Sequence, residues 1–448
     1  MKKFRLPETF EKGSRSYFGG AARSAVVVLA AMLNGAPGAE PRETAAVALD
    51  RHAATYMDLV ADLGALDPES VDVWITPAKA QDRRTAPTLI RISEVSRALA
   101  SKVRNAEGAG EDAPRARTLA MQLDALALRS DQRAGARVLF ADELRRLFGL
   151  ELSDVSLSAD SGGAARDALA RRLPGTGALS RRLSQYQRRF VIPRGRLHAV
   201  ITRSIAACRD QTTRFLALPS GEKLALEYVA DVPWSGYSVY RGNYKSVMQV
   251  NRTLPLSIGQ ALNLACHEGY PGHHTYNILR DQHLVRQQHM REAISGLIFS
   301  PEGFRAEALA AAGAAIAFST AEQIQLYRDH LFPLAGFNPD EAEMYAEVCN
   351  LVDRLSGSTT IAVRGYLSGE MNAADAVSAL ERNALMERPD GLVTYLDRYR
   401  GYTLAYTWGR DRLVSNLNEP ALSVEGRWML LRQFMTSPQG QEDLFAAR

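Results

Sequence analysis

Three histidines and one glutamate lie within eight residues of this chain, in the segment HEGYPGHH from His267 to His274. Neutral imidazole and carboxylate groups are ligands that zinc takes in proteins. In the common zincin arrangement, two histidines stand four residues apart on one helix face, and a glutamate beside the first acts as general base. Here the position four residues after His267 is Pro271, so the second ligand must come from elsewhere.

The next candidates for a second ligand are His273 and His274. On an unbroken helix, His274 would lie about 20° around the axis from His267 but about 10 Å along it, too far for one ion to bind both. His273 would point to another face. A break at Pro271 and Gly272 would bring the second histidine back beside the first. These residues alone support two interpretations equally. One is a metal site, and the other is a kinked helix end at which Pro271 and Gly272 only interrupt the helix.

The elements that must position these residues are mainly helical, because apolar residues recur at steps of three and four through most of the chain. The helices expected from this pattern cover residues 41–63, 86–103, 113–148, 197–218, 258–278, 307–327, 339–366, 373–385 and 421–435. Between Glu222 and Asn251 the sequence is rich in Val and Tyr with approximate alternation, which predicts a small sheet. We therefore expect a mainly α fold with a small β-sheet beside the motif helix.

The length of 448 residues allows one large domain or two to three ordinary ones. We expect an N-terminal extension of residues 1–40, a helical scaffold of residues 41–220 and a metal-binding catalytic region of residues 221–448. The last two can also form one continuous domain.

The charge balance argues against a nucleic-acid partner, because a net charge of +4 over 448 residues leaves no coherent basic footprint. The three cysteines are odd in number and far apart, so no disulfide framework is expected: Cys208, Cys266 and Cys349. A reducing compartment is therefore permitted. The sequence does not indicate an oligomeric state.

Residues 25–33 form the one strongly apolar stretch near the start, and they are too short to span a membrane. The segment before them is long for a signal peptide and contains Glu8 and Glu11, so we expect an amphipathic helix there. This predicts a cytoplasmic protein with no transmembrane segment. Secretion through an atypical N-terminal signal is the alternative.

Around HEGYPGHH the sequence resembles the family called domain of unknown function 885, whose signature is HExxPGH with a frequent second histidine. The resemblance covers roughly residues 42–416, through DPESVDVWITP, LPGTGALS, LPSGEKLALEYVADVPWSGYSVYRGNYKSVMQVN and YRGYTLAYTWG. It implies a large helical zincin-like fold of the gluzincin type and a metallopeptidase with one zinc ion per chain. The family's PGH signature implies that the two histidine ligands are His267 and His273.

The resemblance also implies that a glutamate on a later helix completes the metal site, and Glu302 and Glu307 are the candidates. The family's later motif begins with Ser-Pro and has EG-x-A a few residues on. SPEGFRAEALAAAGAAIAF fits it without gaps when Glu307 takes the Glu position, with Ala308 where glycine is usual. Independently, the apolar residues around Glu307 predict a buried helix, where a carboxylate needs a cation as partner. The alternative is a solvated or capping carboxylate near a helix start.

With zinc held by these three side chains, Glu268 is expected to accept the proton of the attacking water and to return it to the leaving amine. An oxyanion also needs a hydrogen-bond donor besides the metal. Tyr402 and Tyr406 are the candidates, because YRGYTLAYTWG resembles the family's tyrosine pattern. The alternative for these tyrosines is a packed helix face.

Peptides or small amides are thus the expected substrates. Two other functions stay open: a metallohydrolase for non-peptide amides or esters, and a metal-binding pseudoenzyme or peptide-binding scaffold. Residues 244–251 form either an edge strand that pairs with an extended peptide or an internal strand of the sheet.

Overall fold

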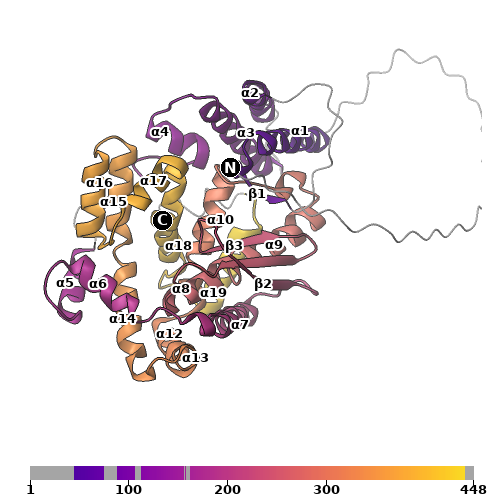
Figure 1. Ribbon diagram of the computed structural model, residues 1–448. Helices are drawn as coiled ribbons and strands as arrows, with labels where there is room; N and C mark the ends of the chain where they lie inside the picture. Colours follow the sequence, from indigo (N-terminus) through magenta and orange to yellow (C-terminus); the bar gives the residue numbers. More distant parts are fainter. Residues whose placement is uncertain (1–44, 75–87, 106–111, 156, 158–161, 439–448) are drawn as a thin grey trace, which may run out of the picture. The chain divides into compact units, whose positions relative to one another are not determined.

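The computed structural model describes residues 45–74, 88–105, 112–155, 157 and 162–438, all within one compact unit. Helices dominate this unit, so the expected mainly α fold is confirmed (Figure 1). The expected extension of residues 1–40 and its amphipathic helix lie outside the described residues. Among the helices of the described residues, none is both long and apolar enough to span a membrane.

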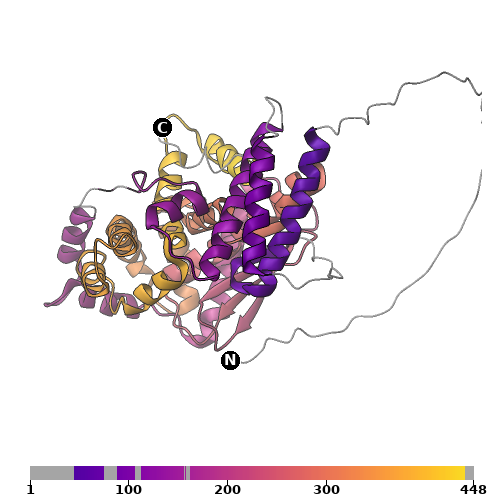
Figure 2. The same ribbon diagram turned by 90° about the horizontal axis from the view of Figure 1, so that it is seen from above.

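Three long helices open the described chain and pack side by side (Figure 2): α1 (Ala45–Leu66), α2 (Leu89–Asn105) and α3 (Ala113–Arg133). Four further helices precede the central sheet: α4 (Phe140–Glu143), α5 (Gly163–Arg172), α6 (Leu179–Arg188) and α7 (Leu197–Phe215). Leu119, Leu123 and Leu126 of α3 are fully buried, as the apolar spacing predicts. Their core cluster also contains Leu404, so both halves of the chain share one core.

The second half of the chain contains twelve of the described helices: α8 (Ile258–Glu268), α9 (His273–Arg280), α10 (Pro301–Ala311), α11 (Gly313–Ala317), α12 (Thr320–Leu326), α13 (Phe332–Ala335), α14 (Ala342–Asp353), α15 (Ser356–Leu367), α16 (Ala373–Asn383), α17 (Asp390–Tyr399), α18 (Trp408–Leu417) and α19 (Val424–Thr436). Short 3-10 segments lie at Pro68–Ser70, Arg194–Arg196, Arg291–Ile294, Pro339–Glu341 and Arg400–Tyr406, and π-helical segments at Leu144–Phe148, Asp281–Gln287 and Tyr327–Leu331. The helix expected at 258–278 is thus interrupted between α8 and α9.

The small sheet expected between residues 222 and 251 is confirmed. Its strands are β2 (Lys223–Val229), β3 (Gly236–Tyr240) and β4 (Lys245–Asn251), in the order β2–β4–β3. β4 pairs in parallel with β2 and antiparallel with β3. The edge-strand interpretation of residues 244–251 is therefore wrong, because β4 has a partner on both sides. A separate antiparallel pair joins β1 (Val71–Trp74) to β5 (Ser295–Leu297).

A disulfide joins Cys208 on α7 to Cys266 on α8, and the expectation of no disulfide is wrong for this pair. The two cysteines are 58 residues apart in sequence, but their Cα atoms lie 5.5 Å apart. Both residues are fully buried where α7 packs against α8. Sequence spacing does not reveal this pairing, because the two cysteines meet only through the packing of α7 against α8. Cys349 is a free thiol.

Replacement of Cys208 by alanine is expected to lower the free energy of unfolding by about 4 kcal/mol, because the disulfide closes a loop of 58 residues. The measurement is denaturant unfolding of the oxidised wild type, the reduced wild type and the variant. Cys349→Ala, which removes no disulfide, is the control. Equal midpoints for oxidised wild type and Cys208→Ala would show that the bond does not stabilise the fold.

Candidate metal centre

The break between α8 and α9 places two histidines beside each other. Helix α8 begins at a capping box, in which Ser257 and Gln260 each bind the other's backbone N–H. Gly272 follows the end of α8, and its N–H donates to the Cys266 carbonyl at 2.9 Å. A Cβ at this position would lie 1.9 Å from the His267 carbonyl oxygen, so only glycine fits. The rings of His267 and His273 consequently lie 4.8 Å apart, nearly perpendicular.

Glu307 reaches the same point from α10. This helix begins at Ser300, whose Oγ accepts a hydrogen bond from the Gly303 N–H at 3.0 Å, with Pro301 in its first turn. The Ser-Pro pair of the sequence motif is therefore the start of the helix. The Glu307 side chain is 6% exposed, with Oε1 3.1 Å from His267 Nε2 and Oε2 3.6 Å from His273 Nε2.

The structure accommodates Ala308, the residue that stands where glycine is usual in the resembled motif. Ala308 is fully buried where α10 meets α18. Its neighbour on α18 is Gly409, where an added Cβ would lie 3.1 Å from the Ala308 methyl. The glycine on α18 thus leaves room for the methyl group on α10.

Two distances between candidate ligand atoms are close to those around a zinc ion. Two atoms bonded to one tetrahedral zinc at about 2.0–2.2 Å lie about 3.3–3.6 Å apart, close to the two distances above. Glu307 Oε1 is buried, and no hydrogen bond to it is present in the described part of the chain. His267 Nε2 lies 3.1 Å from it, at ion-pair distance. Two imidazoles and a buried carboxylate fit a catalytic zinc site.

The electrostatics also favour a cation among these side chains. Burial raises the pKa of the Glu307 carboxyl, but the imidazoles of His267 and His273 outweigh burial and hold this pKa well below its usual range. Burial lowers the pKa of His273, but Glu307 outweighs it and raises the pKa to about 9. Glu307 therefore stabilises positive charge at this point, whether a proton or a metal ion.

Glu268 lies beside this cluster, but it is farther from His267 than Glu307 is. Its Oε1 is 4.0 Å from His267 Nε2, against 3.1 Å for Glu307 Oε1. His267, Glu268 and His273 do present ligand atoms within 4.8 Å of one another. Glu307 lies nearer to both imidazoles and is therefore the better candidate for the third ligand position. Burial raises the pKa of Glu268 against the opposing effect of the imidazoles, which suits a group that accepts and returns a proton.

His274 points away from this cluster and has partners of its own. Its Nδ1 lies 2.7 Å from Ser246 Oγ, and its Nε2 lies 2.9 Å from Glu222 Oε2. Tyr270 also donates to Glu222 Oε2, at 2.7 Å. With both ring nitrogens engaged, His274 has none left for a metal, and the structure places His273 beside His267 instead.

Glu302 likewise has another role. Its carboxylate lies 2.5 Å from Arg280 Nη1 and accepts a hydrogen bond from Tyr276 at 2.9 Å. Arg305 Nη2 lies 3.6 Å away. Because Arg280 and Arg305 are both buried, Glu302 supplies the negative charge that they require. It thereby joins α9 to α10 and positions the helices of His273 and Glu307.

The two candidate tyrosines occupy different positions. The Tyr402 hydroxyl donates to Glu307 Oε2 at 2.7 Å, so it orients that carboxylate. Tyr406 is 38% exposed, and its ring is nearly parallel to that of His267 at 6.2 Å. Burial, together with Glu307, raises the pKa of the Tyr402 phenol well above its usual value, so this phenol stays protonated. Tyr406 lines the cleft described below and Tyr402 does not, so Tyr406 is the candidate for contact with a substrate.

Asp72 and Tyr237 stand at the edge of the site, and sequence reasoning did not identify them. Tyr237 on β3 donates a hydrogen bond to Asp72 on β1. Burial raises the pKa of Asp72, and the charges of His273 and Glu307 also act on it. The available signal was its polar side chain between Val71 and Val73, inside the segment DPESVDVWITP.

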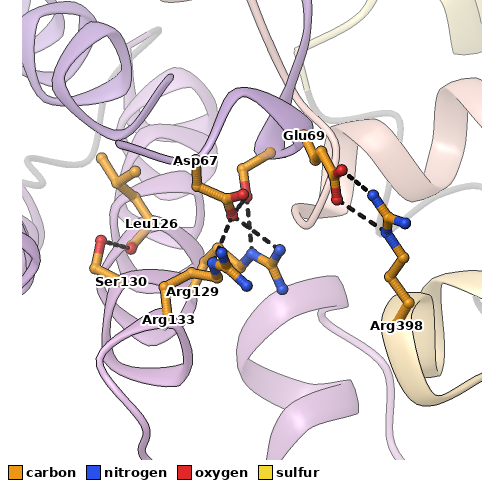
Figure 3. Close-up of polar contacts among 8 residues, drawn as sticks. Asp67, Glu69, Leu126, Arg129, Ser130, Arg133 and Arg398 are labelled. Atoms are coloured by element: carbon orange, nitrogen blue, oxygen red, sulfur yellow. Dashed lines mark hydrogen bonds and ion pairs between the residues drawn. The ribbon is translucent and has the colours of Figure 1, made fainter. Parts of the chain in front are cut away.

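Ion pairs fix the chain just before β1 (Figure 3). Asp67 accepts from Arg129 at 2.9 Å and lies 3.1 Å from Arg133 Nε, so it is held by two arginines of α3. Glu69 pairs with Arg398 of α17, whose Nε donates at 2.9 Å. These contacts tie the strand of Asp72 to helices from both halves of the chain.

A cleft of about 1980 Å³ opens onto the cluster. His267, Glu268 and Tyr406 line it, together with Tyr395 from α17. Other parts of its walls come from α11, α12, α18, α19 and residues 233–236. Glu268 and Tyr406 thus face a space that can receive a substrate.

No family model matches the chain, and no curated protein matches its sequence. Two solved structures are similar in fold. One is a protein from Colwellia psychrerythraea provisionally described as a lipoprotein, with 14% identity and a TM-score of 0.49 over 89% of this chain and 74% of that one. The other is a protein of unknown function from Shewanella oneidensis with the same provisional description, with 11% identity and a TM-score of 0.49 over 91% and 88%. Neither likeness bears on function.

Replacement of His273 by alanine is expected to abolish tight zinc binding, whereas His274→Ala should keep most of the zinc. The His274 variant should instead lose about 1–3 kcal/mol of stability, because buried Ser246 loses its partner and Glu222 keeps only Tyr270 and Arg209. Zinc content after dialysis and thermal unfolding measure the two effects. If His274→Ala loses the metal and His273→Ala keeps it, the two assignments are reversed.

Proposed function

We propose that the protein is a zinc-dependent hydrolase that cleaves peptides, with one zinc ion held by His267, His273 and Glu307. The main support is the buried Oε1 of Glu307, which has no hydrogen bond among the described residues and faces His267 Nε2 at 3.1 Å. A buried acceptor without a hydrogen bond costs about 1–3 kcal/mol, which a metal bond would offset. Bound zinc supplies a Lewis acid that polarises a carbonyl and makes water more acidic.

In the proposed hydrolysis, Glu268 is the general base. Its carboxylate takes the proton of the attacking water and delivers it to the leaving nitrogen. Because burial raises its pKa, the carboxyl group is able to hold that proton between the two steps. Tyr406 donates its hydroxyl proton in a hydrogen bond to the developing oxyanion, and Tyr402 keeps Glu307 in place.

The size of the cleft favours peptides over small amides or esters. Sites for small molecules measure about 300–1,000 Å³, and the cleft of about 1980 Å³ is larger than this. Its wall includes Gly236, the first residue of β3. Among the described strands, β3 pairs only with β4 in its sheet, so its other edge is the place for an extended peptide to pair.

The disulfide is also evidence about the cellular compartment of the protein. Disulfides persist mainly in oxidising compartments, so the Cys208–Cys266 bond favours the periplasm or the cell exterior over the expected cytoplasm. We propose an oxidising compartment for this protein. Alkylation of thiols in whole cells tests this, because only Cys349 should react after denaturation without reductant.

The experiment that tests the proposed function is cleavage of a peptide library by protein of measured zinc content. We expect about one zinc per chain, hydrolysed peptide bonds, loss of cleavage on chelation and recovery when zinc is added. Intact peptides with zinc bound would favour a binding scaffold. Intact peptides together with hydrolysis of non-peptide amides or esters would favour the other hydrolase class.

A further inference from the structure

Five arginines line the cleft in its described part, and they differ in their partners: Arg188, Arg214, Arg354, Arg410 and Arg427. Three of these arginines have a side-chain partner within the protein. Arg188 lies 2.5 Å from Glu387, Arg214 donates to Gln211 at 3.0 Å, and Arg410 lies 2.8 Å from Asp411. Arg354 is exposed, so water solvates it.

Arg427 is different because it is half-buried and has no side-chain partner. Its Nε is shielded from solvent, and the described residues supply no acceptor for the Nε–H. They also supply no carboxylate that pairs with the guanidinium. Arg427 lies in the first turn of α19, where the helix dipole is positive and a cation is disfavoured. Glu425 of the same turn is exposed and forms no ion pair with it. An anion is therefore the missing partner.

The surroundings of Arg427 suit an anionic group on a peptide. Trp428 is buried and stacks on Phe215 at 5.2 Å, and both line the same cleft as Arg427. Three of the four acidic side chains of the described cleft wall have other partners: Glu322 binds Ser319 and Gln211, and Asp353 and Asp411 pair with Arg410. The fourth, Glu268, lies beside the metal cluster. No carboxylate of the described cleft wall thus pairs with Arg427.

We propose that Arg427 binds a carboxylate of the substrate and makes the cleft selective for peptides with that group. A guanidinium forms two parallel, charge-assisted hydrogen bonds with a carboxylate, which fixes its position as well as its charge. The carboxylate comes either from the C-terminus of the peptide or from an acidic side chain. The identity of the ligand as a peptide rests on the proposed function.

The test is equilibrium binding of labelled peptides to zinc-loaded protein with Glu268→Gln, which prevents turnover. Three peptides that differ only in their carboxylate are compared: a C-terminal acid, the corresponding C-terminal amide, and the same amide with one internal Gln replaced by Glu. Carboxylate-bearing peptide should bind about tenfold to a hundredfold more tightly than the neutral amide. If the acid alone has this advantage, the site takes the C-terminus. If the Glu-containing amide has it, the site takes a side chain.

Arg427→Gln should remove this preference, and Arg427→Lys should keep part of it because the charge remains. Arg432→Gln is the matched control, because Arg432 is an exposed residue of the same helix and does not line the cleft. Thermal unfolding verifies that the variants fold. Equal binding of all three peptides to protein with Arg427 intact overturns the inference, as does an equal loss of preference in Arg432→Gln. Carboxylate-dependent binding without cleavage by wild type would instead contradict the proposed peptidase.

Discussion

Replacement of Glu268 by glutamine is expected to slow peptide cleavage by at least about a hundredfold to ten-thousandfold while zinc content and fold stay the same. Proton transfer by a positioned side chain is worth about this factor. Glutamine is close in size but cannot accept the proton, and the Glu268 carboxylate is not among the three assigned ligands. Cleavage rates of wild type and variant are compared at matched zinc occupancy, with thermal unfolding on the same preparations.

Glu322→Gln provides the matched control for this experiment. Glu322 lines the same cleft and caps α12 through Ser319, and glutamine also serves at this position of a capping box. The Glu322→Gln variant should therefore cleave peptides at nearly the wild-type rate. If Glu268→Gln cleaves at that rate too, Glu268 is not the base. If it loses its zinc, Glu268 is a ligand.

The second large effect is expected at Glu307. Glu307→Ala should weaken zinc binding by more than the roughly tenfold to hundredfold that loss of an outer-shell partner costs, because it removes one of three protein ligands. Competition with a chelator of known affinity measures the change. Tyr402→Phe removes only the outer hydrogen bond to Glu307 and should stay within that smaller range.

Glu302→Gln tests the choice between the two glutamates on α10. It should keep the zinc, although it should unfold more easily because Arg280 and Arg305 lose their carboxylate. Zinc content is therefore compared at a temperature where both variants are folded. The same zinc affinity in wild type and Glu307→Ala would contradict the assignment.

The parts of the fold that depend on local sequence could be predicted. The helical periodicity, the strands between residues 222 and 251 and the interruption at Pro271 and Gly272 all follow from neighbouring residues. The start of α10 at Ser300 and Pro301 is also determined by neighbouring residues. This start sets the face of the helix from which Glu307 reaches His267.

The parts that depend on long-range packing could not be predicted. The Cys208–Cys266 bond, the central position of β4 and the hydrogen bond from Tyr237 to Asp72 each join segments through tertiary structure. Tyr402 and Tyr406 share one spacing pattern, and only the packing of their segment against α10 separates their roles. The orphaned Nε of Arg427 likewise has no signature in the sequence.

The most direct test of the zinc site is anomalous diffraction at the zinc edge from crystals of the metal-loaded protein. We predict one zinc per chain, bonded to the Nε2 atoms of His267 and His273 and to the carboxylate of Glu307, with Glu268 beside it and His274 still bound to Glu222. A zinc ion bonded to His274 or Glu302, or no zinc between α8, α9 and α10, would contradict this prediction.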